Sequence, residues 1–505
     1  MNTSVYIVIA IFVYLIAVLS VGFYFMKKNE SASDFYLGGR KLGPLVTAMS
    51  AEASDMSSYL LMGLPGLAYL SGVADVGWTV IGLAAGTYLN WLFTAKRLRR
   101  YTQITNSFTL PQFFSKRFHD NKNILAAIAA LIIIVFFVPY TASGFAACGK
   151  LFNSLFGVDY MTAMIISAIV IVAYTAAGGF LAASTTDFIQ SIMMTFAILF
   201  VLIFATSTAG GVGAVMENAK SLSGYVSLTQ THTADGASAY GPLTIASTLA
   251  WGLGYFGMPH ILLRFMAIKD ENKLKLSRRV ASVWVVIAMA LAVFIGLVGR
   301  ALSSSGLIES LSGNNTETVI VKIAGLLSTY GPVPALVAGL VLAGILACTM
   351  STADSQLLAA ASSVSQNILQ EAFGLKLTQR MSMIVARATV IVIAILGVFI
   401  AKNPDSSVFG IVSFAWAGFG AAFGPVMICA LFWKRSNFPG AVAGMVAGGV
   451  TVFVWKFIIA NLGGVFAIYE LLPAFIVGIV VNVVVSLLTK APSKEITDEF
   501  EAAKG

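Results

Sequence analysis

Otherwise apolar segments of this chain carry oxygen-bearing side chains near their centres. The first, VTAMSAEASDMSSYLLMGLPG at 46–66, holds Glu52, Asp55 and Ser57 in its middle. An ionisable residue inside a membrane costs about 2.5–3.5 kcal/mol on insertion scales and is by default a functional-site hypothesis. We therefore interpret Asp55 as part of a cation or substrate site. The alternative, that Asp55 caps a broken helix, stays open at this point.

The segment GILACTMSTADSQLLAAASS at 344–363 spaces Cys348, Ser351 and Thr352 at i, i+3 and i+4. These three positions share one helix face. Sodium is a hard cation that takes oxygen ligands, and hydroxyls together with carbonyls freed by an unwound helix can replace its water. The spacing is compatible with a sodium site. The alternative is that each hydroxyl bonds the carbonyl four residues earlier in its own helix.

Asp187 opens another apolar segment, STTDFIQSIMM at 184–194. It is either a helix N-cap near the membrane interface or, if the fold brings it to Asp354 and Ser355, part of a second cation or proton site. His260 is interpreted as a packing or hydrogen-bonding residue rather than a proton relay.

The elements that must position these residues are membrane helices. Of the 505 residues, 58% are hydrophobic and 10% are charged, against about 25% charged in soluble proteins. Apolar runs of about 20 residues, the length that spans a bilayer, recur along the chain. The basic residues lie in short loops and not on one face, which argues against nucleic acid as a partner. The composition predicts an all-α polytopic protein in a lipid bilayer.

Hydropathy predicts about 13 transmembrane spans. They lie near 5–26, 44–70, 74–95, 123–149, 159–178, 186–208, 241–267, 280–303, 333–360, 382–401, 407–433, 438–461 and 468–488. Lys and Arg concentrate in the connections 96–122 and 264–279, the latter including Arg264, and this places both in the cytoplasm. An odd span count then puts the N-terminus outside and the C-terminus inside. We expect a plasma-membrane protein with one transport domain at 1–489 and a short cytoplasmic tail at 490–505.

Two of these spans are expected to be discontinuous. The second span holds the carboxylates described above, and the seventh, STLAWGLGYFGMPHILLRFMA at 247–267, should unwind near Gly254 to Pro259. Two interrupted spans that stand five apart in order are what an inverted repeat of five plus five spans produces. The pattern predicts such a core in spans 2–11, with a substrate site at mid-membrane between the two breaks.

Enzyme signatures are missing from this sequence. It contains no HExxH and no GxSxG motif, and it has only 3 His. We predict a transporter rather than an enzyme, and a channel is a further alternative that saturable uptake would exclude.

The sequence resembles the sodium/solute symporter family, in particular its sodium/proline symporters, over nearly the whole chain. The likeness rests on LGGRKLGP at 37–44, ASDMSSYLLMGLPG at 53–66, FTLPQFF at 108–114, YTASG at 140–144, YTAAGGFLA at 174–182, WGLGYFGMPHILLRFMA at 251–267, MSTADSQLL at 350–358, SFAWAGFGAAFGP at 413–425 and KRSNFPGAVAGMVAGG at 434–449. It implies thirteen spans, sodium-coupled uptake of L-proline by alternating access, and no cofactor besides the coupling Na+.

The resemblance also implies functional residues. A sodium site would use the carbonyls of Ala53, Met56 and Cys348 and the hydroxyls of Ser351 and Thr352, with Asp55 in support. Substrate would be bound near Ser57, Ser58, Tyr59, Tyr140, Trp251, Tyr255 and Pro259. Arg40 and Asp187 match positions that affect sodium-dependent transport.

Departures from the proline pattern touch the expected substrate pocket. Ser58 and Tyr59 stand where these relatives have Gly and Trp, and Met258 stands where they have Gln. Glu52 replaces a small residue and, three positions before Asp55, would modulate transport. The open alternative is a sodium or proton symporter for another small solute: another amino acid, a betaine, pantothenate, sialic acid or a sugar.

Overall fold

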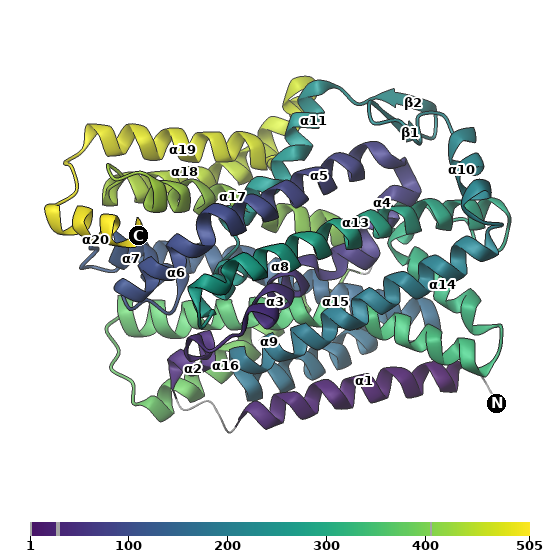
Figure 1. The fold of residues 1–505 in the computed structure, drawn as a ribbon, viewed down its shortest axis with the longest axis horizontal. Coiled ribbons are helices and arrows are strands. Elements are labelled where there is room, and N and C mark those ends of the chain that lie inside the picture. The colour runs from purple at the N-terminus through teal and green to yellow at the C-terminus, as the bar shows by residue number, and fades with distance from the viewer. Residues whose placement is uncertain (1–2, 27–30, 404–406, 505) are drawn as a thin grey trace.

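Long apolar stretches form helices that run along the longest axis of the molecule (Figure 1). The structure is a computed structural model that describes residues 3–26, 31–403 and 407–504. Within these residues, nine helices are long and apolar enough to cross a membrane. They lie in α1 (Thr3–Met26), α8 (Ile124–Phe156), α9 (Tyr160–Thr208), α13 (Leu274–Ser304), α15 (Pro332–Ser362), α16 (Gln379–Ile400), α17 (Val408–Phe432), α18 (Phe438–Val454) and α19 (Leu471–Leu488).

The second predicted span is broken. It consists of α3 (Pro44–Ser58), a π-helical turn η2 (Tyr59–Gly63) and α4 (Leu64–Ser71). Ser57, at the end of α3, has φ 48° and ψ −170°, a left-handed conformation that residues other than glycine rarely adopt. The break therefore falls two residues after Asp55, in the middle of the apolar segment.

The seventh predicted span is also broken. It consists of α11 (Pro242–Leu249), a 3-10 helix η4 (Ala250–Phe256) and α12 (Pro259–Ala267). Met258 is extended, with φ −74° and ψ 108°, and Pro259 occupies the first turn of α12, where its missing N–H costs no helical hydrogen bond. The break thus lies at the end of the Gly254 to Pro259 stretch in which the sequence predicts unwinding.

The two broken spans are tied together at one end. The Leu42 N–H donates to Ala267 O (3.2 Å), and the Lys269 N–H donates to Leu42 O (2.9 Å). This short parallel bridge joins the start of α3 to the end of α12, and the two helices also pack against each other. The predicted all-α fold with two discontinuous helices in an inverted-repeat core is confirmed, while the count of thirteen spans stays a prediction.

The fifth and sixth predicted spans are two helices that meet at a sharp kink within α9. Gly179 has φ 61° and ψ −158° inside it, and a Cβ there would lie 2.9 Å from Phe35 O. A glycine is thus required by both conformation and space. The boundary between the predicted spans 159–178 and 186–208 therefore falls at this kink, where two helices meet directly. Asp187 consequently lies inside a helix, so the N-cap alternative is wrong.

Shorter elements complete the bundle. They are α2 (Ala32–Leu37), η1 (Gly38–Arg40), α5 (Val73–Leu89), η3 (Asn90–Thr94), α6 (Ala95–Ile104), α7 (Leu110–Arg117), α10 (Val212–Ser221), β1 (Gln230–Thr233), β2 (Gly236–Ala239), η5 (Glu271–Lys273), η6 (Gly313–Thr318), α14 (Val319–Ser328), η7 (Ser363–Ala372), η8 (Trp455–Ile459), η9 (Ala460–Leu462), η10 (Gly464–Phe466) and α20 (Lys494–Lys504). The two strands pair antiparallel, with Gln230 opposite Ala239.

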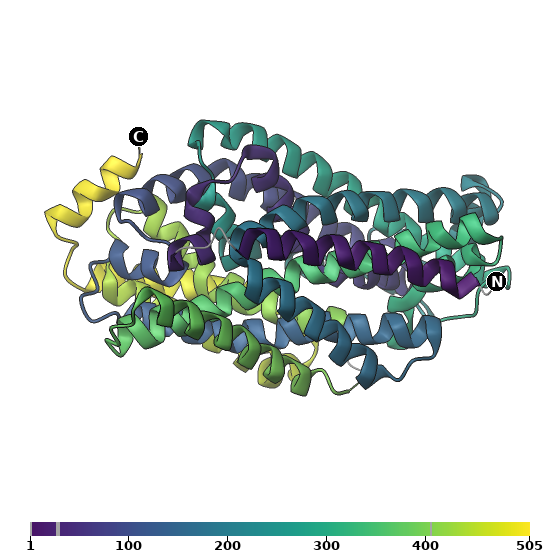
Figure 2. The ribbon, with the colours of Figure 1, turned by 90° about the horizontal axis from the view of Figure 1, so that it is seen from below.

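The two ends of the bundle differ. In Figure 1, α6, α7 and α20 lie at the left end, and the β1–β2 hairpin and α10 lie at the right. Figures 1 and 2 both place α1 on the outside of the bundle. The C-terminal helix α20 is docked, since Phe500 is buried and Glu499 contacts the His119 ring at 3.0 Å.

Candidate functional site

Oxygen atoms of α3 and α15 meet close to the break in α3. The Ser351 hydroxyl donates to Ala53 O at 2.8 Å and to Cys348 O at 3.1 Å. The Thr352 hydroxyl lies 3.4 Å from Cys348 O. All four residues are buried, so two hydroxyls and two carbonyls from helices almost 300 positions apart in sequence form one dry cluster.

This cluster has the chemistry that a small hard cation requires. Each of its four atoms is an uncharged oxygen, and neutral oxygens bind sodium reversibly when the site excludes most water. Met56 lies one turn beyond Ala53, and its carbonyl accepts a hydrogen bond from the Tyr59 N–H. Four of the five predicted sodium ligands are therefore brought together, and the fifth, Met56, lies one turn further along α3.

Two carboxylates of α3 have different partners: Asp55 contacts η4 of the other broken span, and Glu52 contacts η3. Asp55 Oδ2 accepts a hydrogen bond from the Tyr255 hydroxyl, and the Asn90 amide donates to Tyr255 O at 3.0 Å. Glu52 Oε1 accepts from the Trp91 indole at 3.1 Å, while Glu52 Oε2 is buried with no partner among the described residues. Asp55 thus joins the two breaks directly.

A small cavity lies beside Asp55 between the breaks. It is lined by Asp55, Met56, Tyr59, Leu83, Tyr140, Trp251, Val412 and Trp416. The Trp251 ring stacks on Tyr59 with centroids 5.9 Å apart and on Tyr469 at 4.9 Å. Flat rings of this kind offer apolar surface at low entropic cost. The wall therefore suits an apolar ligand, while the free volume here, about 10 Å3, holds only about one water molecule.

The polar atoms around this cavity are incompletely paired. The hydroxyls of Ser58 and Tyr59 are buried and find no hydrogen-bond partner in the part of the chain that the structure describes. The Ser57 hydroxyl accepts from the Tyr59 N–H at 3.1 Å, and Ser57 O accepts from the Cys348 thiol. Because an unpaired buried hydroxyl is costly, these groups are available to a polar ligand.

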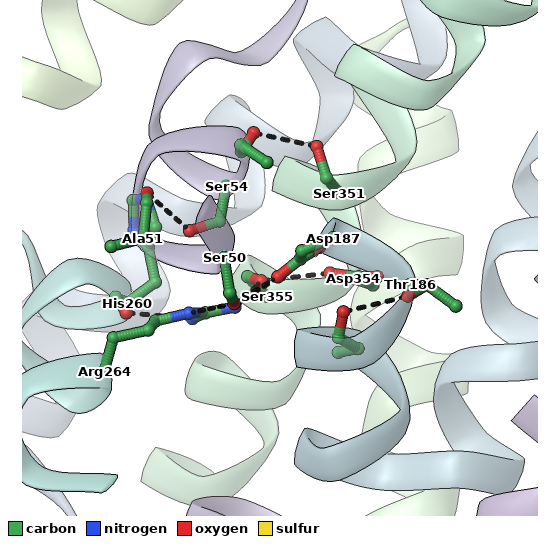
Figure 3. Close-up of polar contacts among 12 residues, drawn as sticks. Ser50, Ala51, Ser54, Thr186, Asp187, His260, Arg264, Ser351, Asp354 and Ser355 are labelled. Atoms are coloured by element: carbon green, nitrogen blue, oxygen red, sulfur yellow. Dashed lines mark hydrogen bonds and ion pairs between the residues drawn. The ribbon is translucent and has the colours of Figure 1, made fainter. Parts of the chain in front are cut away.

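A second polar cluster centres on a buried arginine (Figure 3). Arg264 of α12 donates from Nη2 to Asp187 Oδ2 at 3.0 Å and to the Ser355 hydroxyl, and from Nε to the Ser50 hydroxyl at 3.0 Å. Its side chain is 1% exposed. Arg264 falls where the predicted span 241–267 and the predicted basic connection 264–279 overlap; the structure places it in α12, with a carboxylate partner inside the bundle.

Asp354 belongs to the same cluster. Its Oδ1 accepts from the Ser355 hydroxyl at 3.0 Å, and its Oδ2 accepts from the Tyr174 hydroxyl at 2.9 Å. Ser50 also donates to Asp187 Oδ2 at 2.6 Å. The structure therefore brings Asp187, Asp354 and Ser355 together, as the sequence hypothesis requires, but it also places the Arg264 guanidinium among them.

Replacing Arg264 by lysine is expected to lower stability although it preserves the charge. An ammonium cannot reproduce the planar fork that serves Ser50, Asp187 and the His260 carbonyl, and each lost bond to a charged group costs about 1.5–3 kcal/mol. The melting temperature of the purified protein should fall clearly below that of Arg300→Lys, a control at a more exposed arginine that lies over Tyr69. Equal melting temperatures would contradict this role of Arg264.

The remaining predicted residues lie near the ends of the broken helices. Arg40 donates to Met266 O at 2.6 Å, and to Thr102 O and Ser107 O at 2.9 and 2.7 Å, so it ties α12 to α6 and to the turn after α6. Pro259 begins α12. The His260 ring packs 5.6 Å from the Phe137 ring.

Sequence reasoning missed part of the cavity wall. The Trp416 indole donates to Trp251 O at 2.8 Å, and its ring packs edge-on against Tyr255. A Cβ on Gly254 would lie 2.0 Å from Trp416 Nε1, so this glycine makes room for the indole. The sequence does mark Trp416, because it is the one tryptophan in the Gly- and Ala-rich segment SFAWAGFGAAFGP. Tyr469, which does not line the cavity but stacks on Trp251, had no comparable signal.

The sequence matches one family of transporters and individual transporters over most of its length. The profile of the Sodium:solute symporter family matches residues 35–448. The osmoregulated proline transporter OpuE of Bacillus subtilis is 39% identical over 492 residues, covering 97% of this chain and 96% of its own length. The sodium/proline symporter of Escherichia coli is 40% identical over 493 residues, covering 97% and 95%.

A solved structure extends the likeness to the fold. It is the substrate-bound outward-open state of a Na+-coupled sialic acid symporter, with a TM-score of 0.77 at 19% identity, covering 97% of this chain and 99% of its own. The architecture is therefore that of a multi-pass membrane transporter, and its relatives are transporters and not enzymes. With a family profile that covers most of the sequence and relatives near 40% identity, the chain belongs to the sodium:solute symporter family, whose coupling ion is Na+.

Proposed function

We propose that this protein imports L-proline together with Na+ by alternating access. The observation that carries the proposal is the pairing of two sites at one break: the oxygen cluster of α3 and α15 adjoins a cavity lined by Tyr59 and Trp251. The proline relatives from B. subtilis and E. coli support the choice of solute.

Sodium is assigned to the oxygen cluster between α3 and α15. Its ligands would be the carbonyls of Ala53, Met56 and Cys348 and the hydroxyls of Ser351 and Thr352. Asp55 would support the ion through its negative charge and through its bond to Tyr255. Because the cluster joins a broken helix to an unbroken one, an ion there would stabilise one arrangement of the two and so shift an equilibrium that exists without it.

Proline is assigned to the neighbouring cavity, which must widen to admit it because its free volume in this structure is about 10 Å3. The residues expected to contact it are Ser57, Ser58, Tyr59, Tyr140, Trp251, Tyr255 and Pro259. Its carboxylate needs donors, which the unpaired hydroxyls of Ser58 and Tyr59 and N–H groups freed at the breaks would supply. Its apolar ring would pack on the aromatic faces of Tyr59 and Trp251.

A second cation or proton at Asp187, Asp354 and Ser355 is proposed only for a different state of the protein. In the present structure the Arg264 guanidinium already neutralises Asp187, and a further positive charge beside it would be repelled. Arg40 and Glu52 are proposed to modulate transport, since they fix α12 and α3 to α6 and η3.

One sodium ion per proline is energetically sufficient. Moving one charge through 100 mV releases about 2.3 kcal/mol, and a tenfold sodium gradient adds about 1.4 kcal/mol. The sum, about 3.7 kcal/mol, allows on the order of 500-fold accumulation of a neutral solute.

The proposed topology has thirteen spans, an N-terminus outside the plasma membrane and a cytoplasmic C-terminus. Basic residues of α6 and α7 and the C-terminal helix α20 lie at the same end of the bundle (Figure 1). The positive-inside rule assigns that end to the cytoplasm. Residues 1–489 would form the transport domain, and 490–505 would form the tail that contains α20.

The proposal is tested by substrate-induced currents of the reconstituted protein. Proline should produce a current that requires sodium and saturates with proline concentration. Betaine, pantothenate, sialic acid and sugars should give none. A sodium-dependent current with one of these solutes and not with proline would support sodium-coupled symport but contradict proline as the solute.

Tyr59→Trp is expected to narrow solute selection. A larger ring facing Trp251 leaves less room, so a six-membered-ring analogue such as pipecolate should lose about tenfold in uptake relative to proline, the lower range for one methylene. Competition against labelled proline measures this ratio. Tyr330→Trp, at a side chain that is 60% exposed, is the control, and an equal ratio in both variants would count against Tyr59 as a selectivity residue.

A further inference from the structure

An apolar groove runs between α9 and α13 on the outside of the bundle. Its volume is about 520 Å3. Ile198 and Leu199 of α9 form one wall, and Val283, Trp284 and Ile287 of α13 form the other. The Trp284 indole donates to the Thr195 hydroxyl at 2.9 Å, so the walls are joined and the groove is not a gap that side-chain movement would readily close.

The length of the groove matches one leaflet of a bilayer. It extends along α13 from Arg279 to Leu291, which is about 18 Å at the helical rise of 1.5 Å per residue. Half of a bilayer's hydrocarbon core is about 15 Å thick. One acyl chain lying along α13 would therefore be covered from the membrane surface to the midplane.

One end of the groove is basic and the rest is apolar. Arg279 is exposed and makes no hydrogen bond or ion pair with the described part of the chain. Lys275 lies one turn before it and is also exposed. Glu271, at the start of this segment, is paired with Arg100 instead. The charge at the groove's end is thus available to an anion outside the protein.

The lining of the groove also includes the broken helix. Met49 of α3 forms part of its lining and is 9% exposed. The next residue, Ser50, contacts Asp187 at 2.6 Å and Arg264 at 3.0 Å. A molecule in the groove would therefore press on the same helix that carries Ala53 and Asp55.

We propose that this groove is a binding site for one anionic phospholipid, with an acyl chain along α13 and the headgroup phosphate at Arg279. An arginine near the membrane surface contributes about 1 kcal/mol to the binding free energy of anionic headgroups. The bound lipid supports α3 in the position seen here. This site is separate from the solute cavity and does not depend on which solute is transported.

Native mass spectrometry of the purified protein, equilibrated with phosphatidylglycerol and phosphatidylcholine together, tests the proposal. The wild type should retain phosphatidylglycerol in preference. Arg279→Gln should reduce that preference about fivefold, which corresponds to about 1 kcal/mol, and Arg279→Lys should preserve most of it. Val283→Trp, which fills the groove at a 60% exposed position, should reduce retention of both lipids.

The matched controls lie on α16. Arg380→Gln changes an exposed arginine in the first turn of another membrane helix, and Ile391→Trp enlarges a lipid-facing side chain that is 46% exposed. Neither should alter lipid retention. Equal retention of the two lipids by the wild type, or the same loss in Arg380→Gln as in Arg279→Gln, would overturn the proposal. Because this readout needs no transport, its failure is distinguishable from failure of the proposed function.

Discussion

Alanine at Thr352 is expected to raise the sodium concentration for half-maximal uptake by about ten- to a hundredfold. The variant removes one oxygen from the cluster in which Ser351 and Thr352 meet the carbonyls of Ala53 and Cys348. A hydrogen-bond-like contact to a charged partner contributes about 1.5–3 kcal/mol, and 1.4 kcal/mol corresponds to a factor of ten. Initial uptake rates at a series of sodium concentrations, with proline saturating, measure the change.

A control for this variant lies on the same helix. Thr349→Ala removes a buried hydroxyl that bonds Ile345 O, four residues earlier in α15, so its sodium requirement should stay near that of the wild type. Asp55→Ala should behave like Thr352→Ala, because the carboxylate supports the ion by its charge. Unchanged sodium dependence in both Thr352→Ala and Asp55→Ala would remove the sodium assignment.

Alanine at Trp251 is expected to raise the proline concentration for half-maximal uptake by roughly thirtyfold or more. The Trp251 ring lines the cavity and stacks on Tyr59 and Tyr469. Removing a large aromatic side chain from the centre of a binding site costs about 2–4 kcal/mol of binding free energy. Proline concentration series at saturating sodium measure the effect, and the sodium requirement should change far less.

Trp455→Ala provides the comparison for this loss. Its indole bonds Phe466 O at the end of α18, away from the cavity, so proline affinity should be preserved. If Trp455→Ala weakened proline uptake as much as Trp251→Ala, the loss would reflect general destabilisation. An unaltered proline requirement in Trp251→Ala would place the substrate elsewhere.

The positions of the two breaks could be predicted because they leave a compositional trace. Polar side chains such as Glu52, Asp55 and Ser57 are unfavourable in a helix that faces lipid. The glycines and the proline between Gly252 and Pro259 lower the stability of a continuous helix. The spacing of Cys348, Ser351 and Thr352 likewise follows from helical periodicity. These features depend on neighbours in sequence, so the sequence alone specifies them.

Other features depend on neighbours in space. Arg264 looks like the first basic residue of a cytoplasmic loop, and only its contact with Asp187, 77 positions away, makes it a buried residue. Trp416 joins the cavity wall because α17 packs on η4, and Tyr469, in the segment before α19, stacks on the Trp251 ring. The kink at Gly179 was hidden because a left-handed glycine can interrupt a helix without ending it.

Accumulation of labelled L-proline in liposomes containing the purified protein tests the central claim most directly. An inward sodium gradient is compared with equal potassium and proton gradients, and an ionophore collapses each in turn. The account predicts accumulation that requires the sodium gradient and is lost when that gradient is collapsed. Folded protein that accumulates no proline under the sodium gradient, or that accumulates it equally under potassium, would contradict sodium/proline symport.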